Sequence, residues 1–198
     1  MTNKTYQVKI TLQDSKPSIW RRVLIPSDLS LPDFHKVIQT TMGWTNSHLH
    51  HFVKNRTYSS PEMEDKSLWD EKDDNDLDYS KFKVSDLLKK QKDKVKYEYD
   101  FGDDWEHTIV LEKIGDESMD IKDVTCLAGE NSCPPEDCGG LWGYYNMLEI
   151  LKNPDHEQYK EYSDWLGDEF DPTYFDIDEV TDMLGSEDFG ALDFSDFL

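Results

Sequence analysis

The chain has 198 residues, of which 36% are hydrophobic and 13% are aromatic. It is long and apolar enough for one substantial core, and this composition excludes a disordered chain. No apolar run reaches membrane-spanning length, the N-terminus lacks the hydrophobic segment of a signal peptide, and the three cysteines favour a reducing compartment over a disulfide framework. We therefore expect one cytoplasmic domain over residues 1–198, with no membrane partner.

The net charge of −22 is distributed unevenly. Residues 1–60 carry eight Lys or Arg and three acidic residues, whereas no Lys or Arg follows Lys160. Because a negative field repels phosphate backbones, direct nucleic-acid binding over a broad surface is disfavoured. The basic first third leaves a localised contact open, and the alternative is that the two parts pair within the fold.

Alternating apolar and polar residues predict three strands in the first third, at residues 6–12, 19–25 and 48–53. Between the second and third strands, Ser30 predicts the start of a helix because its hydroxyl can accept from unpaired backbone amides. Gly43 suits the left-handed end of that helix. Residues 62–78 contain nine acids and two lysines and predict an acidic loop, and residues 84–90 predict a short helix.

The segment from Tyr97 to His107 is the most informative of the chain. On each side of Gly102, Asp103 and Asp104, apolar and polar residues alternate, which predicts a hairpin, since Gly and Asp tolerate the positive φ of short turns. We expect Asp103, Asp104 and His107 to lie within one turn of each other. They either satisfy turn amides and pack at the sheet edge, or form a binding or catalytic site.

The second half predicts a loop and then helices. Residues 126–140 are rich in Pro and Gly and predict a loop, and helices are expected at residues 142–151, 157–166 and 178–184. Asp178 or its neighbour is expected to cap the last helix, and the acidic tail 186–198 to dock as a short helix or to fray. The predicted fold is a single α+β domain with a mixed, mainly antiparallel sheet and helices packed against it.

Four blocks of the sequence resemble one known family. They are Tyr-Asp-Phe-Gly-Asp-x-Trp-x-His at residues 99–107, Pro-Ser-Ile-Trp-Arg-Arg-Val at 17–23, Met-Gly-Trp leading to His-Leu-His-x-Phe at 42–52, and Cys-Pro-Pro-Glu-Asp-Cys-Gly-Gly at 133–140. In order and spacing they are similar to the plasmid pRiA4b Orf-three-like family, whose members often travel as passengers of mobile elements. The resemblance covers roughly residues 5–180 and implies no established activity.

Histidines in the third strand are the first group that can carry chemistry. His48, His50 and Phe52 would point to one face of a strand, and two imidazoles about 7 Å apart can share a metal. The alternative is a polar sheet face or aromatic contacts for the imidazoles. His35, on the preceding helix, is expected to pack rather than to ligate.

Cysteines form the second group. Cys126, Cys133 and Cys138, together with His107, would supply three thiolates and one imidazole to a tetrahedral zinc site. The spacing is not that of a standard zinc ribbon, and the alternative is apolar packing of free cysteines.

Two neighbouring acids form the third group. Glu136 and Asp137 lie between Pro-Pro and Gly-Gly, which would present them rigidly. They either cap the helix that follows or join Asp103 and Asp104 in a pocket near His107 and Trp105. Such a pocket can take a cationic or hydrogen-bonding ligand, or a hard metal.

The segment Trp20-Arg21-Arg22 suggests contacts to nucleic acid, because Arg binds phosphate and Trp stacks on bases. Two arginines are a weak electrostatic surface, however. We expect them to pair with the acidic second half, at Asp103 or Glu136.

The leading interpretation is an accessory or recognition protein that binds a protein or small-molecule partner through an acidic-aromatic pocket. The alternative is a metal-dependent hydrolase or nuclease-like enzyme that uses His48, His50, Asp103, Asp104 and His107. Against the enzyme, the sequence has no Walker loop, nucleophile elbow or His-Glu-x-x-His motif.

Overall fold

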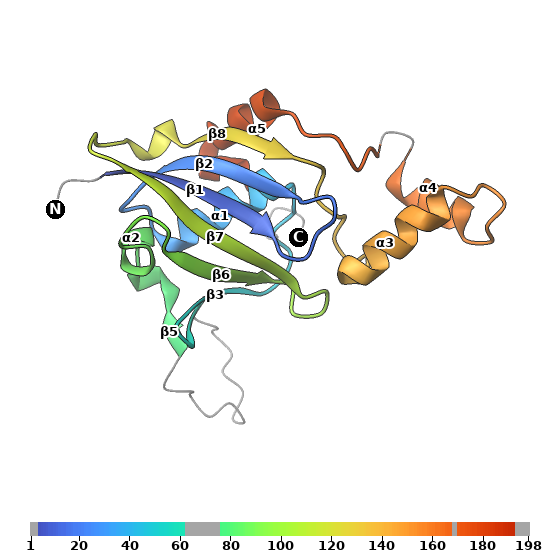
Figure 1. Cartoon of the computed structure of the whole chain (residues 1–198), viewed down its shortest axis with the longest axis horizontal. Helices are drawn as coiled ribbons and strands as arrows, with labels where there is room; N and C mark the ends of the chain where they lie inside the picture. The colour runs from blue at the N-terminus through green and yellow to red at the C-terminus, as the bar shows by residue number, and fades with distance from the viewer. Residues whose placement is uncertain (1–3, 62–75, 168–169, 193–198) are drawn as a thin grey trace.

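A computed structural model describes residues 4–61, 76–167 and 170–192 of the chain. It confirms an α+β fold built on one eight-stranded sheet (Figure 1). The strands are β1 (Thr5–Leu12), β2 (Trp20–Pro26), β3 (His50–Lys54), β4 (Thr57–Ser60), β5 (Asp76–Asp78), β6 (Lys94–Tyr99), β7 (Trp105–Gly115) and β8 (Thr125–Glu130). Their order across the sheet is β5-β4-β3-β6-β7-β1-β2-β8. Every neighbouring pair is antiparallel except β4 with β5, so the sheet is mixed and mainly antiparallel, as predicted.

Alternation along the central strands divides the sheet into two faces. In β1 every second residue is buried, from Tyr6 to Leu12, and β6 and β7 show the same period. The buried face carries the core, where each fully buried aliphatic or aromatic side chain contributes roughly 1.5–3 kcal/mol. The alternation therefore also determines which polar residues of these strands enter the core.

Helix α1 (Leu31–Met42) lies behind the buried face of the sheet (Figure 1). Ser30 caps it by accepting from the amide of Asp33, and Gly43 ends it with a φ of 87°, both as predicted. The buried side of the helix includes Phe34 and Ile38, which pack in the core. This end of α1 leads directly into the loop that begins at Trp44.

Four further helices complete the described fold. They are α2 (Val84–Leu87), α3 (Gly140–Leu151), α4 (Tyr159–Leu166) and α5 (Ile177–Leu184). Helix α5 lies beside β8, whereas α3 and α4 lie together beyond the end of the sheet (Figure 1). In the described residues, no helix is both long enough and apolar enough to span a membrane.

Several boundaries differ from the predicted ones. Residues 125–130, predicted mainly as loop, form strand β8, which pairs with β2. Asp176, rather than Asp178, caps α5 by accepting from the amides of residues 178 and 179. In the predicted acidic loop, residues 76–78 form β5, and residues 62–75 lie outside the described part of the chain.

The acidic tail docks in part. A 3-10 turn (Glu187–Gly190) buries Phe189, whose carbonyl accepts a hydrogen bond from Thr40. Residues 193–198 of the tail lie outside the described residues.

Candidate functional site

Three loops meet at the end of the sheet nearest α3, and we call this meeting point the three-loop junction. It comprises residues 44–48 after α1, the turn 100–104 between β6 and β7, and residues 133–139 before α3. The indole Nε1 of Trp44 donates to the carbonyl of Pro134 at 3.0 Å, and the amide of Gly139 donates to the carboxylate of Asp103 at 3.1 Å. Three of the four family-like blocks are therefore in direct contact, although they are distant in sequence.

The backbone at Gly140 lies close to the backbone of Asp103, and this contact holds the loop 133–139 against the hairpin turn. Gly140 has a φ of 65°, and a Cβ there would lie 2.5 Å from the carbonyl oxygen of Asp103. Only glycine accommodates both the left-handed backbone and this approach. The Gly-Gly pair thus lets the loop dock on the turn as well as begin α3.

Asp100 is fixed by the turn that it begins. It is 8% exposed and has a φ of 55°. Its Oδ1 accepts from the amide of Gly102 at 2.9 Å, and its own amide donates to the carbonyl of Leu49 at 2.9 Å. The other carboxylate oxygen, Oδ2, lies 3.7 Å from Nε2 of His48.

Glu136 connects its own loop to the loop after α1 and to Tyr99, the last residue of β6 before the hairpin turn. It accepts from the hydroxyl of Tyr99 and from both the amide and the hydroxyl of Thr45, the amide at 3.1 Å. Burial, reinforced by this carboxylate, raises the pKa of Tyr99, so the phenol stays protonated and donates. Because its carboxylate is occupied by these bonds, Glu136 orients the loop that presents Asp137.

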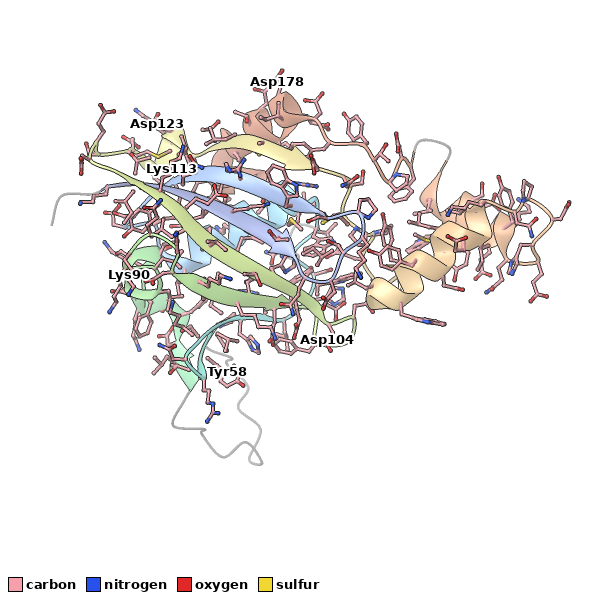
Figure 2. The ribbon with its side chains drawn as sticks, viewed as in Figure 1. Tyr58, Lys90, Asp104, Lys113, Asp123 and Asp178 are labelled. Carbon is pink, nitrogen blue, oxygen red and sulfur yellow. The ribbon has the colours of Figure 1, made fainter. Side chains whose placement is uncertain are left out.

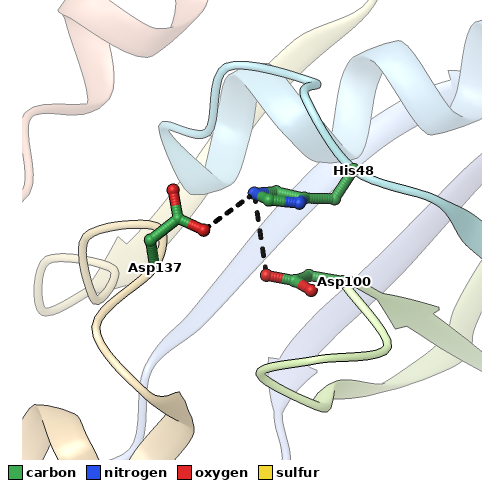
Figure 3. Close-up of side chains that lie close together, drawn as sticks. All are labelled: His48, Asp100 and Asp137. Atoms are coloured by element: carbon green, nitrogen blue, oxygen red, sulfur yellow. Dashed lines mark ion pairs between the residues drawn. The ribbon is translucent and has the colours of Figure 1, made fainter.

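Asp137 approaches the same nitrogen of His48 as Asp100 does, but from the loop before α3 (Figure 3). Its Oδ1 lies 3.3 Å from Nε2 of His48, and its side chain is 74% exposed. Neither Asp137 nor Glu136 caps α3, whose N-cap is Gly139 without a side-chain hydrogen bond. The capping alternative for these two acids is therefore wrong.

His48 completes the group. Its Nε2 is shielded from solvent and has no hydrogen-bond partner among the described residues. One donor atom each from His48, Asp100 and Asp137 lies within 4.8 Å of the others, and in the described ranges this is the one set of three or more such donors. An imidazole nitrogen and two carboxylates can hold a cation between them.

His50 does not share this site. Strand β3 begins at His50, so His48 lies in the loop before the strand, where its ring contacts Tyr99, whereas His50 is buried in the strand. The ring of His50 stacks on that of His35 with centroids 3.4 Å apart, and burial, with the neighbouring His35 and His51, lowers the pKa of His50 to about 2. His50 is absent from the donor group of His48, so the structure gives the predicted His48–His50 metal pair no support, whereas the expected packing role of His35 is confirmed.

The hairpin separates the polar residues that the sequence grouped together. His107 and Trp105 are fully buried in the core, and burial lowers the pKa of His107 to about 4. Asp104 lies at the tip of the hairpin on the surface (Figure 2). Asp103 contacts the third loop, but Asp104 and His107 do not belong to the donor group around His48.

The cysteines do not form the predicted zinc site. Cys126, Cys133, Cys138 and His107 are all described, and they do not come together as one group of donors. Burial raises the pKa values of Cys133 and Cys138 to about 12, so both remain thiols. Packing of free cysteines is the role that fits.

The arginines pair internally, but with other partners than expected. Arg21 is buried and donates to the carbonyls of Thr41, Glu130 and Asn131. Arg22 makes a two-pronged contact with the carboxylate of Glu112, at 2.6 and 3.0 Å. Trp20 donates to Glu130 at 2.9 Å. None of these contacts involves Asp103 or Glu136, so this block supports the sheet and not the junction.

Asp100 is the residue of the site that sequence reasoning missed. In the sequence it reads only as one polar residue of the alternation before the hairpin turn. Its position two residues before Gly102 was the available signal, because an Asp side chain readily accepts from the amide two residues on.

Three of the four blocks on which the family resemblance depends therefore meet at one acidic end of this α+β fold. The chain belongs to the plasmid pRiA4b ORF-3-like protein family, whose model matches residues 4–179. It is 35% identical over 173 residues to uncharacterized protein y4hQ of Sinorhizobium fredii, covering 84% of this chain and 83% of that protein. It is also similar to the crystal structure of protein MM3350, of unknown function, from Methanosarcina mazei Go1. That match has 36% identity and a TM-score of 0.77, and covers 91% of this chain and 99% of the other.

Proposed function

We propose that the protein is a recognition module that binds a positively charged ligand at the three-loop junction. The observation that carries this proposal is the convergence of Asp100 and Asp137 on Nε2 of His48, at 3.7 and 3.3 Å. The ligand is a small cation or the cationic group of a protein partner. This keeps the acidic-aromatic pocket expected from the sequence, with Asp100 added and Asp104 and His107 removed.

Electrostatics supports a cation over an anion. The carboxylates of Asp100, Glu136 and Asp137 lie on adjoining loops, and among the described residues Asp100 and Asp137 form ion pairs with His48. The net charge of −22 adds a long-range attraction for cations and a repulsion for phosphate. Arg21 and Arg22 are engaged by the protein itself, which further disfavours nucleic acid as the partner.

A pair of charge-matched variants tests the proposal. Asp137→Asn removes one charge at the junction, whereas Asp164→Asn removes one charge on α4, where Asp164 pairs with Lys160. Calorimetric titration with spermidine and with Mn²⁺ should show that at least one of the two cations binds wild type and Asp164→Asn alike. Binding to Asp137→Asn should be at least tenfold weaker. If neither cation separates the two variants, the junction is not a cation-binding site.

A metal-dependent hydrolase is the second candidate function. The observation in its favour is that Asp137 is largely exposed, which leaves one side of the donor group open to water and substrate. Hydrolysis of bis-p-nitrophenyl phosphate with added Mn²⁺, and its loss in His48→Ala, would support the enzyme. Turnover equal to that of Mn²⁺ alone would leave binding as the function.

A further inference from the structure

We infer that the ligand of the three-loop junction is one divalent metal ion, coordinated by Nε2 of His48, Oδ2 of Asp100 and Oδ1 of Asp137. The inference rests on the proposed function and names its ligand. The three atoms come from three loops that are joined to one another by hydrogen bonds, so the site is assembled by the tertiary fold.

The distances fit a shared ion better than direct hydrogen bonds. An N–H···O hydrogen bond spans about 2.7–3.2 Å, and Nε2 of His48 has no hydrogen-bond partner among the residues described. Two ligand atoms that are each about 2.1 Å from one metal ion lie about 3.0 Å apart at a right angle and about 3.4 Å apart at the tetrahedral angle. The two nitrogen–oxygen separations are 3.3 and 3.7 Å (Figure 3), so each lies within a few tenths of an ångström of the tetrahedral spacing, and all three donor atoms lie within 4.8 Å of one another.

The donor atoms are oriented before any ion binds. Asp100 uses Oδ1 to accept from the turn amide of Gly102, which leaves Oδ2 directed at His48. The carboxylate of Glu136 accepts hydrogen bonds from Tyr99 and Thr45, and these bonds anchor the loop that carries Asp137. Such outer contacts are the usual means by which proteins fix the geometry of metal ligands.

The donor set indicates which ions fit. Ca²⁺ and Mg²⁺ favour oxygen-only sites, whereas imidazole with carboxylates suits Mn²⁺, Fe²⁺ or Zn²⁺. Among these, Zn²⁺ should bind more tightly than Mn²⁺, following the general order of divalent affinities. The exposure of Asp137 leaves further coordination positions for water or a second ligand.

The test is calorimetric titration of chelator-treated full-length protein with MnCl₂, ZnCl₂ and CaCl₂. Wild type should bind one Mn²⁺ and one Zn²⁺ at the same site, shown by competition, and Ca²⁺ at least tenfold more weakly. His48→Ala and Asp137→Asn should each weaken Mn²⁺ binding at least tenfold. Asp164→Asn should stay within about twofold of wild type, because it changes the net charge equally without touching the junction. His156→Ala removes a partly buried histidine far from the junction in sequence, and it controls for zinc bound by a single imidazole elsewhere.

Asp137 is exposed and makes no turn or cap hydrogen bond in the described structure. Asp137→Asn should therefore leave the free energy of unfolding unchanged, so a loss of binding would not reflect unfolding. Equal Mn²⁺ affinity in Asp137→Asn and Asp164→Asn would overturn the inference, since it would show a diffuse attraction to the acidic surface. Spermidine binding that depends on Asp137, without Mn²⁺ or Zn²⁺ binding, would overturn the metal ion but keep the cation-binding function. If wild type binds neither spermidine nor a metal ion at the junction, both the metal inference and the proposed cation-binding function are overturned.

Discussion

Acidification from pH 7 to pH 5 should strongly destabilise this protein, because its core holds neutral histidines. Burial is the first cause that lowers the pKa of His35 to about 4, of His50 to about 2 and of His107 to about 4, from a usual value of 6.5. The unfolded chain therefore binds more protons than the folded chain once the pH falls below about 6.5. Stability is lost from there downward, until the folded-state pKa values are reached.

The magnitude follows from the proton uptake of the unfolded chain. Between pH 7 and pH 5, a histidine with an unfolded pKa of 6.5 that stays neutral in the fold lowers the free energy of unfolding by about 2 kcal/mol. Three such histidines would lower it on the order of 5 kcal/mol, which is a large part of the stability of a typical domain. Partial relief of the repulsion within a chain of net charge −22 acts in the opposite direction.

A variant isolates the histidine contribution from the rest. His107 is fully buried beside Trp44 and Tyr97, and neither ring nitrogen has a partner of normal hydrogen-bond geometry among the described residues. Replacement by leucine therefore costs little hydrogen bonding and removes one titrating group. Urea denaturation at constant ionic strength should show a pH 7 to pH 5 loss about 2 kcal/mol smaller in His107→Leu than in wild type. Equal losses in the two proteins would refute the reasoning.

Three further predictions concern the supports of the fold and the junction. Gly140→Ala should lower the free energy of unfolding by about 1 kcal/mol more than Gly43→Ala. Both glycines have a positive φ, but only a Cβ at Gly140 would lie against a backbone oxygen. Equal losses of free energy in urea denaturation would show that the close approach at Gly140 is not rigid. Arg21→Lys should lower the free energy of unfolding by about 2–3 kcal/mol, since lysine cannot reproduce the forked hydrogen bonds to buried carbonyls. Arg22 is partly exposed, so Arg22→Lys should lower it by under about 1 kcal/mol. The reverse order would be inconsistent with the burial of Arg21. Duplex DNA should bind no more tightly than roughly the micromolar range at physiological salt, and a tighter, salt-sensitive affinity that Arg22→Ala abolishes would argue for a nucleic-acid surface.

The sequence predicted the framework of the sheet because alternation is a local signal. The same alternation, read strictly, places His107 with Trp105 and Ile109 on the buried face, and it places Arg21 with Val23. The sequence interpretation nevertheless assigned His107 to the site, because its residue type suggested chemistry. Burial is thus the stronger guide when a histidine lies at an apolar position of a strand.

Other parts of the structure depend on tertiary contacts that no local pattern contains. Strand β8 was missed because Gly129 and Ala128 have low strand propensity, and what holds the strand is its pairing with β2 and the close packing of Gly129 on Phe175. Asp100 was missed because its role depends on a loop that begins 33 residues later at Cys133. The sequence offers the meeting of the turn with that loop as one of two alternatives for Glu136 and Asp137, but it does not indicate which carboxylates face His48.

The most direct test of the cation site is anomalous diffraction from crystals grown with Mn²⁺ after chelator treatment. We predict one strong anomalous peak about 2.1–2.3 Å from Nε2 of His48 and from the facing oxygens of Asp100 and Asp137. Anomalous peaks confined to other surface carboxylates, with none between these three side chains, would contradict the assignment of the junction as a metal site.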